Sequence, residues 1–77
     1  MQILYFAELK EILKKNTEII EINDSISVKQ LKETINAKYP EVSEKTYQIA
    51  VNEEFVQDND TVKNMDIVAL IPPVSGG

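Results

Sequence analysis

The hydrophobic residues of this chain form two continuous runs, one near each end. Residues 2–7 read Gln-Ile-Leu-Tyr-Phe-Ala, and residues 67–71 are apolar at every position. A short apolar run of this kind predicts a strand that is buried on both faces. Pro72 and Pro73 follow the second run and predict its end, because proline cannot donate a hydrogen bond to a sheet. We therefore expect a buried strand at each end of the chain.

The segment that follows the first strand carries apolar residues at helical spacing. Over residues 8–15, Leu9, Ile12 and Leu13 alternate with lysine and glutamate. This spacing predicts a short amphipathic helix. Asn16 is expected to close the helix in a left-handed conformation.

A second and longer helix is predicted over residues 28–39. Ser27 and Gln30 have the spacing of a capping box, in which each side chain bonds to the backbone of the other residue. Pro40 predicts the end of this helix. Its apolar stripe consists of Val28, Leu31, Ile35 and Tyr39. Such a helix normally covers one face of a sheet.

The remaining segments predict shorter strands joined by polar turns. The expected elements are a strand over 17–22, a strand over 47–51, a two-residue turn at Asn52-Glu53 and a return strand over 54–57. A polar loop is expected over 58–64, with Asp60 capping a single helical turn. The order of these elements predicts an α+β fold, with a mixed sheet of four or five strands and one main helix across one face.

One main helix cannot cover both faces of such a sheet. If Ile3 and Tyr5 face the helix, alternation places Leu4 and Phe6 on the opposite face. In the last strand, the outward positions are then Ile67, Ala69 and Ile71, and Phe55 of the hairpin can join them. An uncovered apolar face of this size predicts a surface that binds another protein.

Composition removes most kinds of chemistry from consideration. The 77 residues include no Cys, His, Trp or Arg, which excludes a thiolate nucleophile, an imidazole base and the usual zinc and iron–sulfur ligands. No metal site is expected. The formal net charge of −5 argues against nucleic acid or anionic lipid as a partner. Without a long apolar run or a leader pattern, the cytoplasm is the expected location.

Both glycines of the chain are its last two residues, Gly76 and Gly77. They follow Pro72-Pro73-Val74-Ser75, in which the prolines favour an extended stem. Six residues of this kind reach roughly 20 Å from the domain. Glycine has no Cβ, so this end can enter a narrow channel. We expect a domain over residues 1–71 and an extended tail over 72–77.

The apolar strand that leads into Pro-Pro-Val-Ser-Gly-Gly, on this order of elements, resembles the MoaD family of small, sulfur-carrier subunits of molybdopterin synthase. These are ubiquitin-like β-grasp proteins, and the resemblance covers the whole chain. It includes Tyr5-Phe6-Ala7, the helix start at Ser27 and the Val51-Asn52 hairpin. Two turns depart from the family pattern: Glu53 stands where the family often has glycine, and Lys63-Asn64-Met65-Asp66 replaces the usual Asp-Gly-Asp.

The resemblance implies a role for the end of the chain. A ubiquitin-activating-like adenylyltransferase would use ATP and magnesium to adenylate Gly77, and sulfur from a donor would then replace AMP. Gly76 would fit the narrow site. The thiocarboxylate would donate sulfur to precursor Z, cyclic pyranopterin monophosphate, inside the large synthase subunit.

The resemblance also implies how the chain works with its partner. The chain itself would bind no cofactor and would be a non-catalytic subunit, active only in a heterotetramer of two small and two large subunits. The residues expected to bind the partner are Phe6, Phe55, Ile71, Pro72, Pro73, Val74 and Ser75.

Two other functions remain open at this point. The first is a sulfur carrier for thiazole (thiamin) synthesis or a ubiquitin-like protein modifier, either of which shares the adenylation step. Thiazole carriers tend to be shorter between the first two strands, so the predicted helix at 8–15 counts against them. The second is a non-covalent binding module whose Gly-Gly end has no chemical role.

Overall fold

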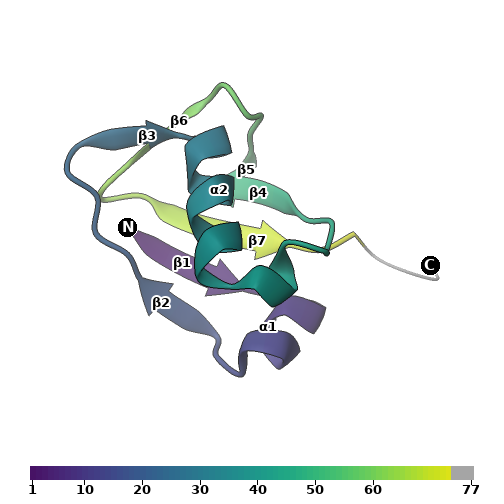
Figure 1. Cartoon of the computed structure of the whole chain (residues 1–77). Coiled ribbons are helices and arrows are strands. Elements are labelled where there is room, and N and C mark those ends of the chain that lie inside the picture. The colour runs from purple at the N-terminus through teal and green to yellow at the C-terminus, as the bar shows by residue number, and fades with distance from the viewer. Residues whose placement is uncertain (74–77) are drawn as a thin grey trace.

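The computed structural model describes residues 1–73 and contains seven strands, two α-helices and one 3₁₀ turn. The elements run in the order β1 (Gln2–Tyr5), α1 (Ala7–Leu13), β2 (Thr17–Ile19), β3 (Ser25–Ser27), α2 (Val28–Lys38), η1 (Pro40–Val42), β4 (Gln48–Val51), β5 (Glu54–Phe55), β6 (Thr61–Lys63) and β7 (Ile67–Ile71) (Figure 1). The predicted α+β class is confirmed.

The main sheet has five strands in the order β2-β1-β7-β4-β5. The two apolar end strands, β1 and β7, lie side by side and parallel, with Ile3 opposite Val68 and Tyr5 opposite Leu70. Both neighbours of this pair, β2 and β4, run antiparallel to it, so the sheet is mixed. β7 has the bounds expected from its apolar run, and its place beside β1 explains why both runs are apolar throughout.

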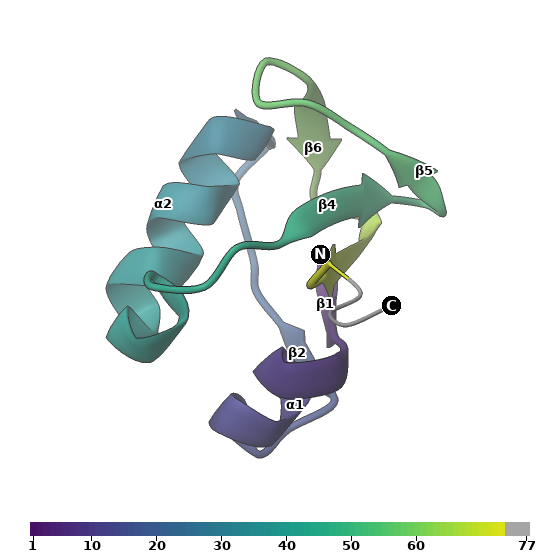
Figure 2. The ribbon, with the colours of Figure 1, turned by 90° about the vertical axis from the view of Figure 1, so that its right-hand side faces the viewer.

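Helix α2 crosses one face of this sheet, as Figures 1 and 2 show. Its capping box is present: the Ser27 hydroxyl accepts a hydrogen bond from the Gln30 amide, and the Gln30 side chain accepts one from the Ser27 amide, both at 3.0 Å. Val28, Leu31 and Ile35 are fully buried. They pack in one core with Ile3, Tyr5, Leu9, Val42, Ile49, Val62, Val68 and Leu70.

Two sequence expectations about the ends of α1 and β1 were wrong. Lys14, and not Asn16, closes α1 in the left-handed conformation, with φ 57°. β1 ends at Tyr5 because Ala7 also takes a positive φ, 52°, which turns the chain directly into α1.

The segment around Asp60 also differs from its prediction. Instead of capping a helical turn, the Asp60 carboxylate accepts a hydrogen bond from the Gln57 amide at 2.7 Å and closes a turn. The chain then forms β6, which pairs antiparallel with β3 in a separate two-stranded sheet. Val62 of β6 is fully buried opposite Ile26, and this burial favours a strand at this place.

The strands predicted over 17–22 and 54–57 are shorter in the structure, where they cover Thr17–Ile19 and Glu54–Phe55. No helix in the described part of the chain is long and apolar enough to cross a membrane.

Candidate protein-binding surface

The face of the main sheet opposite α2 carries a row of apolar side chains. Leu4 of β1 pairs with Ala69 of β7, Ala69 pairs with Ala50 of β4, and Ala50 pairs with Phe55 of β5. Paired residues of neighbouring strands point to the same face of a sheet. The row therefore crosses four strands. Figure 2 shows α2 on the other side of the sheet, and within residues 1–73 no helix covers this row.

This face is hollowed into a groove of about 750 Å³, which we name the outer groove. It is lined by Leu4, Phe6, Ala50, Asn52, Glu53, Phe55, Ile67, Ala69 and Ile71. Three of its large apolar side chains are exposed: Phe6 by 44%, Phe55 by 66% and Ile67 by 47%. The predicted division of β1 and β7 into a buried and an outward set is confirmed. Ile3 and Tyr5 of β1 and Val68 and Leu70 of β7 are buried, whereas Leu4 and the alternate positions of β7 line the groove.

The turn after β1 positions Phe6 at one end of the groove. The Tyr5 amide donates a hydrogen bond to the Asn16 carbonyl at 2.8 Å, and the Tyr5 side chain is buried on the α2 side. Phe6 then points to the other side, and the left-handed Ala7 turns the chain away immediately after it. Phe6 is thus held beside the groove by two backbone features.

The β4–β5 hairpin forms the opposite wall of the groove. Asn52 and Glu53, with φ of 51° and 73°, make the two-residue turn that was predicted there. The Asn52 side chain accepts a hydrogen bond from the Ile67 amide at 3.0 Å and donates one to the Asp66 carboxylate at 3.1 Å. These bonds attach the hairpin to the start of β7. Sequence reasoning missed the part that Asn52 and Glu53 play in lining the groove.

β7 forms the floor of the groove and leads toward the tail. Ile71 lies at the end of the strand, after which Pro72 is buried and Pro73 is exposed. Val74, Ser75, Gly76 and Gly77 lie outside the described residues. Of the residues predicted to bind a partner, the structure therefore brings Phe6, Phe55 and Ile71 together in one groove.

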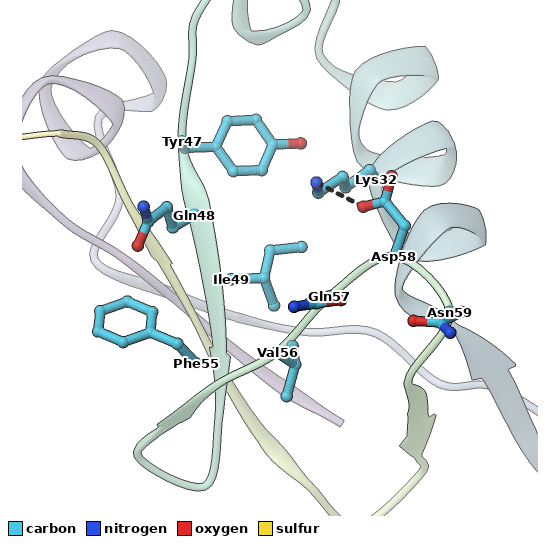
Figure 3. Close-up of a pocket in the computed structure, with 9 residues that line it drawn as sticks. All are labelled: Lys32, Tyr47, Gln48, Ile49, Phe55, Val56, Gln57, Asp58 and Asn59. Atoms are coloured by element: carbon cyan, nitrogen blue, oxygen red, sulfur yellow. Dashed lines mark hydrogen bonds and ion pairs between the residues drawn. The ribbon is translucent and has the colours of Figure 1, made fainter.

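A second hollow of about 750 Å³ lies between α2 and the segment after β5 (Figure 3). It is more polar, and the Lys32 ammonium pairs there with the Asp58 carboxylate at 2.7 Å. Burial raises the pKa of Tyr47, whose hydroxyl donates a 3.3 Å hydrogen bond to Asn36. Phe55 lines both hollows, so it forms the ridge between them.

On the α2 side, a polar cluster surrounds the carboxylate of Glu18. Partial burial acts to raise the pKa of this group, but hydrogen bonds from Lys38, Tyr39 and Tyr5 outweigh it and lower the pKa to about 2. Burial and the bond to Glu18 raise the pKa of Tyr5 above its usual value. The cluster joins β1, β2 and the end of α2, so its role is structural. Within residues 1–73, no group of three or more acidic side chains is placed to hold a metal ion.

Comparison with known proteins assigns the chain to a family. The model of the ThiS family matches residues 3–77. The chain is 37% identical to the molybdopterin synthase sulfur carrier subunit of Chlamydomonas reinhardtii, over all of this chain and 98% of that protein. It is 34% identical to the Homo sapiens protein of the same name, over all of this chain and 93% of that protein.

Solved structures show the same fold. A putative molybdopterin converting factor subunit 1 from Pyrococcus furiosus has a TM-score of 0.85 at 26% identity, over 95% of both chains. A chain of the complex of subunits 1 and 2 of the molybdopterin-converting factor from Helicobacter pylori has a TM-score of 0.68 at 26% identity, over 99% of this chain and 96% of that one. SAMP1 from Haloferax volcanii has a TM-score of 0.83 at 22% identity, over 100% of this chain and 98% of that one. At this identity the similarity shows a shared fold alone.

Proposed function

The chain belongs to the ThiS family, and from this membership we propose that it is the sulfur-carrier subunit of a molybdopterin synthase. Its similarity to two proteins of that name, across nearly their whole length, supports the proposal.

One structural observation carries the proposal: a single strand connects the outer groove to the tail. β7 supplies Ile67, Ala69 and Ile71 to the groove and continues into Pro72. A partner seated on the groove is therefore directly beside the point where the tail leaves the domain. The arrangement suits a carrier whose reactive end must enter a site on the protein to which its body is docked.

The reactive group in this proposal is the α-carboxylate of Gly77. A carboxylate oxygen attacks the α-phosphorus of ATP, and pyrophosphate leaves, with magnesium held by the activating enzyme. Hydrosulfide then attacks the acyl carbon of the adenylate, a C–S bond forms, and AMP leaves with the former carboxylate oxygen. The resulting thiocarboxylate is a good sulfur nucleophile. The chain has no cysteine, so it cannot carry sulfur as a protein persulfide.

The partner in the transfer step is the large synthase subunit. The Helicobacter pylori structure is a complex of subunits 1 and 2, which supports docking of this chain to a second subunit. We propose a cytoplasmic assembly of two small and two large subunits that transfers sulfur to precursor Z. Two sulfurs build one dithiolene, so each product requires two loaded carriers or one carrier loaded twice.

Mass spectrometry tests the loading step. The purified chain is incubated with its activating enzyme, ATP, magnesium and sulfide, and the C-terminal peptide is then analysed. Replacement of one oxygen by sulfur adds about 16 Da, and the attack of hydrosulfide on the adenylate places the new sulfur on the acyl carbon of Gly77. A gain at another residue, or no gain, would refute the proposed chemistry. A covalent adduct between Gly77 and a lysine of another protein would favour the modifier function instead.

A further inference from the structure

Glu53 stands in a backbone conformation that glutamate disfavours. It is the second residue of the two-residue turn between β4 and β5, with φ 73°. With Asn52 at φ 51°, both central residues are left-handed, which is the pattern of a type I′ turn. Glycine is preferred at the second position because it lacks the Cβ that meets the backbone there. Glu53 therefore strains the backbone at a position where glycine would make the domain more stable.

The same residue lines the outer groove. Most of its other lining groups are apolar, and Glu53 is the charged residue among the nine described ones. The Glu53 side chain is exposed, and none of the three ion pairs within residues 1–73 includes it. A carboxylate thus lies at the edge of an apolar surface without a cation from its own described chain.

We propose that Glu53 determines partner specificity by pairing with a lysine or arginine of the large subunit that docks on the outer groove. This inference rests on the proposed function. Docking removes water from the groove and its edge, so the carboxylate there loses hydration, and a cation of the partner is needed to offset the cost of this loss. A protein that lacks such a cation binds the groove more weakly. Glu53 thus favours the large subunit over other proteins with an apolar surface. Backbone strain at this position is the cost of keeping the charge.

The chain offers a matched control in the next residue. Glu54 is also exposed and carries the same charge, but it does not line the outer groove. Because neighbouring residues of a strand point to opposite faces, Glu54 and Phe55 lie on different sides of β5. Changes at Glu54 alter the net charge equally without altering the edge of the groove.

The test measures the affinity of the small subunit for the large subunit of the same organism by titration calorimetry. Glu53→Gln is expected to weaken binding by at least about fivefold, and Glu53→Lys by more, whereas Glu54→Gln changes it by less than about twofold. The salt dependence of the affinity falls in Glu53→Gln and stays unchanged in Glu54→Gln.

Glu53→Gly separates the proposed role from a structural one. Relief of strain is expected to raise the melting temperature of the free chain by roughly 4–8 °C, while binding to the large subunit weakens. A residue with a structural role alone would move stability without this loss of affinity.

Two failures can be told apart. If Ile71→Asp abolishes binding but all three Glu53 variants bind like the wild type, the inference about Glu53 is wrong and the proposed docking face stands. If the wild-type chain does not bind the large subunit, the proposed function fails and the inference fails with it.

Discussion

The hydroxyl of Tyr39, at the end of α2, donates a 2.7 Å hydrogen bond to the carboxylate of Glu18 on β2. Tyr5 of β1 donates to the same oxygen, also at 2.7 Å, and Lys38 bonds to the other oxygen. Only 11% of the Glu18 side chain is exposed. The main helix is thus attached to the edge of the sheet through one partly buried negative charge.

This attachment makes stability depend on pH. The pKa of Glu18 falls from an ordinary value of 4.5 to about 2 on folding, so the folded state favours the charged carboxylate. The stabilisation is fully present above pH 4.5 and is lost as the pH falls toward 2. We expect the free energy of unfolding to decrease by about 2–3 kcal/mol across this range because of Glu18.

Urea denaturation between pH 2 and pH 7 measures the effect. In Glu18→Gln the stability at pH 7 is lower, and the part of the pH dependence due to Glu18 disappears. Asp24→Asn provides a control, since Asp24 lies in the bend between β2 and β3 and takes no part in the hydrogen bonds to Glu18. Equal pH dependence in Glu18→Gln and the wild type would contradict the proposed attachment.

A second prediction concerns Asn52, which combines a left-handed backbone with two side-chain hydrogen bonds to the start of β7. Asn52→Gly keeps the conformation and loses the bonds, so the free energy of unfolding should fall by about 1–2 kcal/mol. Asn52→Ala loses the bonds and adds strain, so a loss of about 2–3 kcal/mol is expected. Chemical denaturation would show both losses. Equal stability of the two variants would mean that the left-handed backbone at residue 52 adds no strain in Asn52→Ala.

A third prediction concerns the apolar face. Phe6→Asp puts a charge beside the outer groove, and we expect binding to the large subunit to weaken by about a hundredfold or more. The free domain should stay folded, because Phe6 is exposed and outside the core. Ile19→Asp is the matched control: Ile19 is 67% exposed but does not line the groove. Equal losses in both variants would show that charge on the whole face, and not the groove, controls binding.

A fourth prediction concerns the end of the chain. Deletion of Gly77, or Gly76→Val, should abolish or strongly reduce the 16 Da gain expected from thiocarboxylation. Neither change should alter the melting temperature, because the described core ends at Leu70. Mass spectrometry and thermal denaturation of the same samples separate the two effects. Full loading of Gly76→Val would show that the activating enzyme tolerates a side chain at this position.

The sequence carried most of the information about the main sheet and α2. Residues 67–71 formed a strand with the expected bounds because a run that is apolar at every position has few alternatives in a chain this short. The capping box of Ser27 and Gln30 predicted the start of α2, because both of its hydrogen bonds join residues only three positions apart in the sequence. The two-stranded sheet of β3 and β6 was missed. Each of its strands has three residues, too few to display alternation.

Part of the candidate surface could be predicted from the alternation of side chains along the strands. Phe6 and Ile71 were assigned to the outer face because neighbouring residues of a strand point to opposite sides. Asn52 and Glu53 could not be assigned to the groove in this way. Their place beside Ile67 depends on hydrogen bonds between segments that are 15 residues apart in the sequence.

The parallel pairing of β1 with β7 has a consequence for how the protein is made. β1 pairs with β7, which is synthesised after every other strand that the structure describes, so the main sheet cannot close on a nascent chain that ends before Ile67. Pairing between such distant segments also slows folding. We therefore expect the domain to fold after nearly all of it has been synthesised. A prematurely terminated chain would then lack a closed core and become a substrate for proteases, so truncated copies would not compete with the intact protein for its partners.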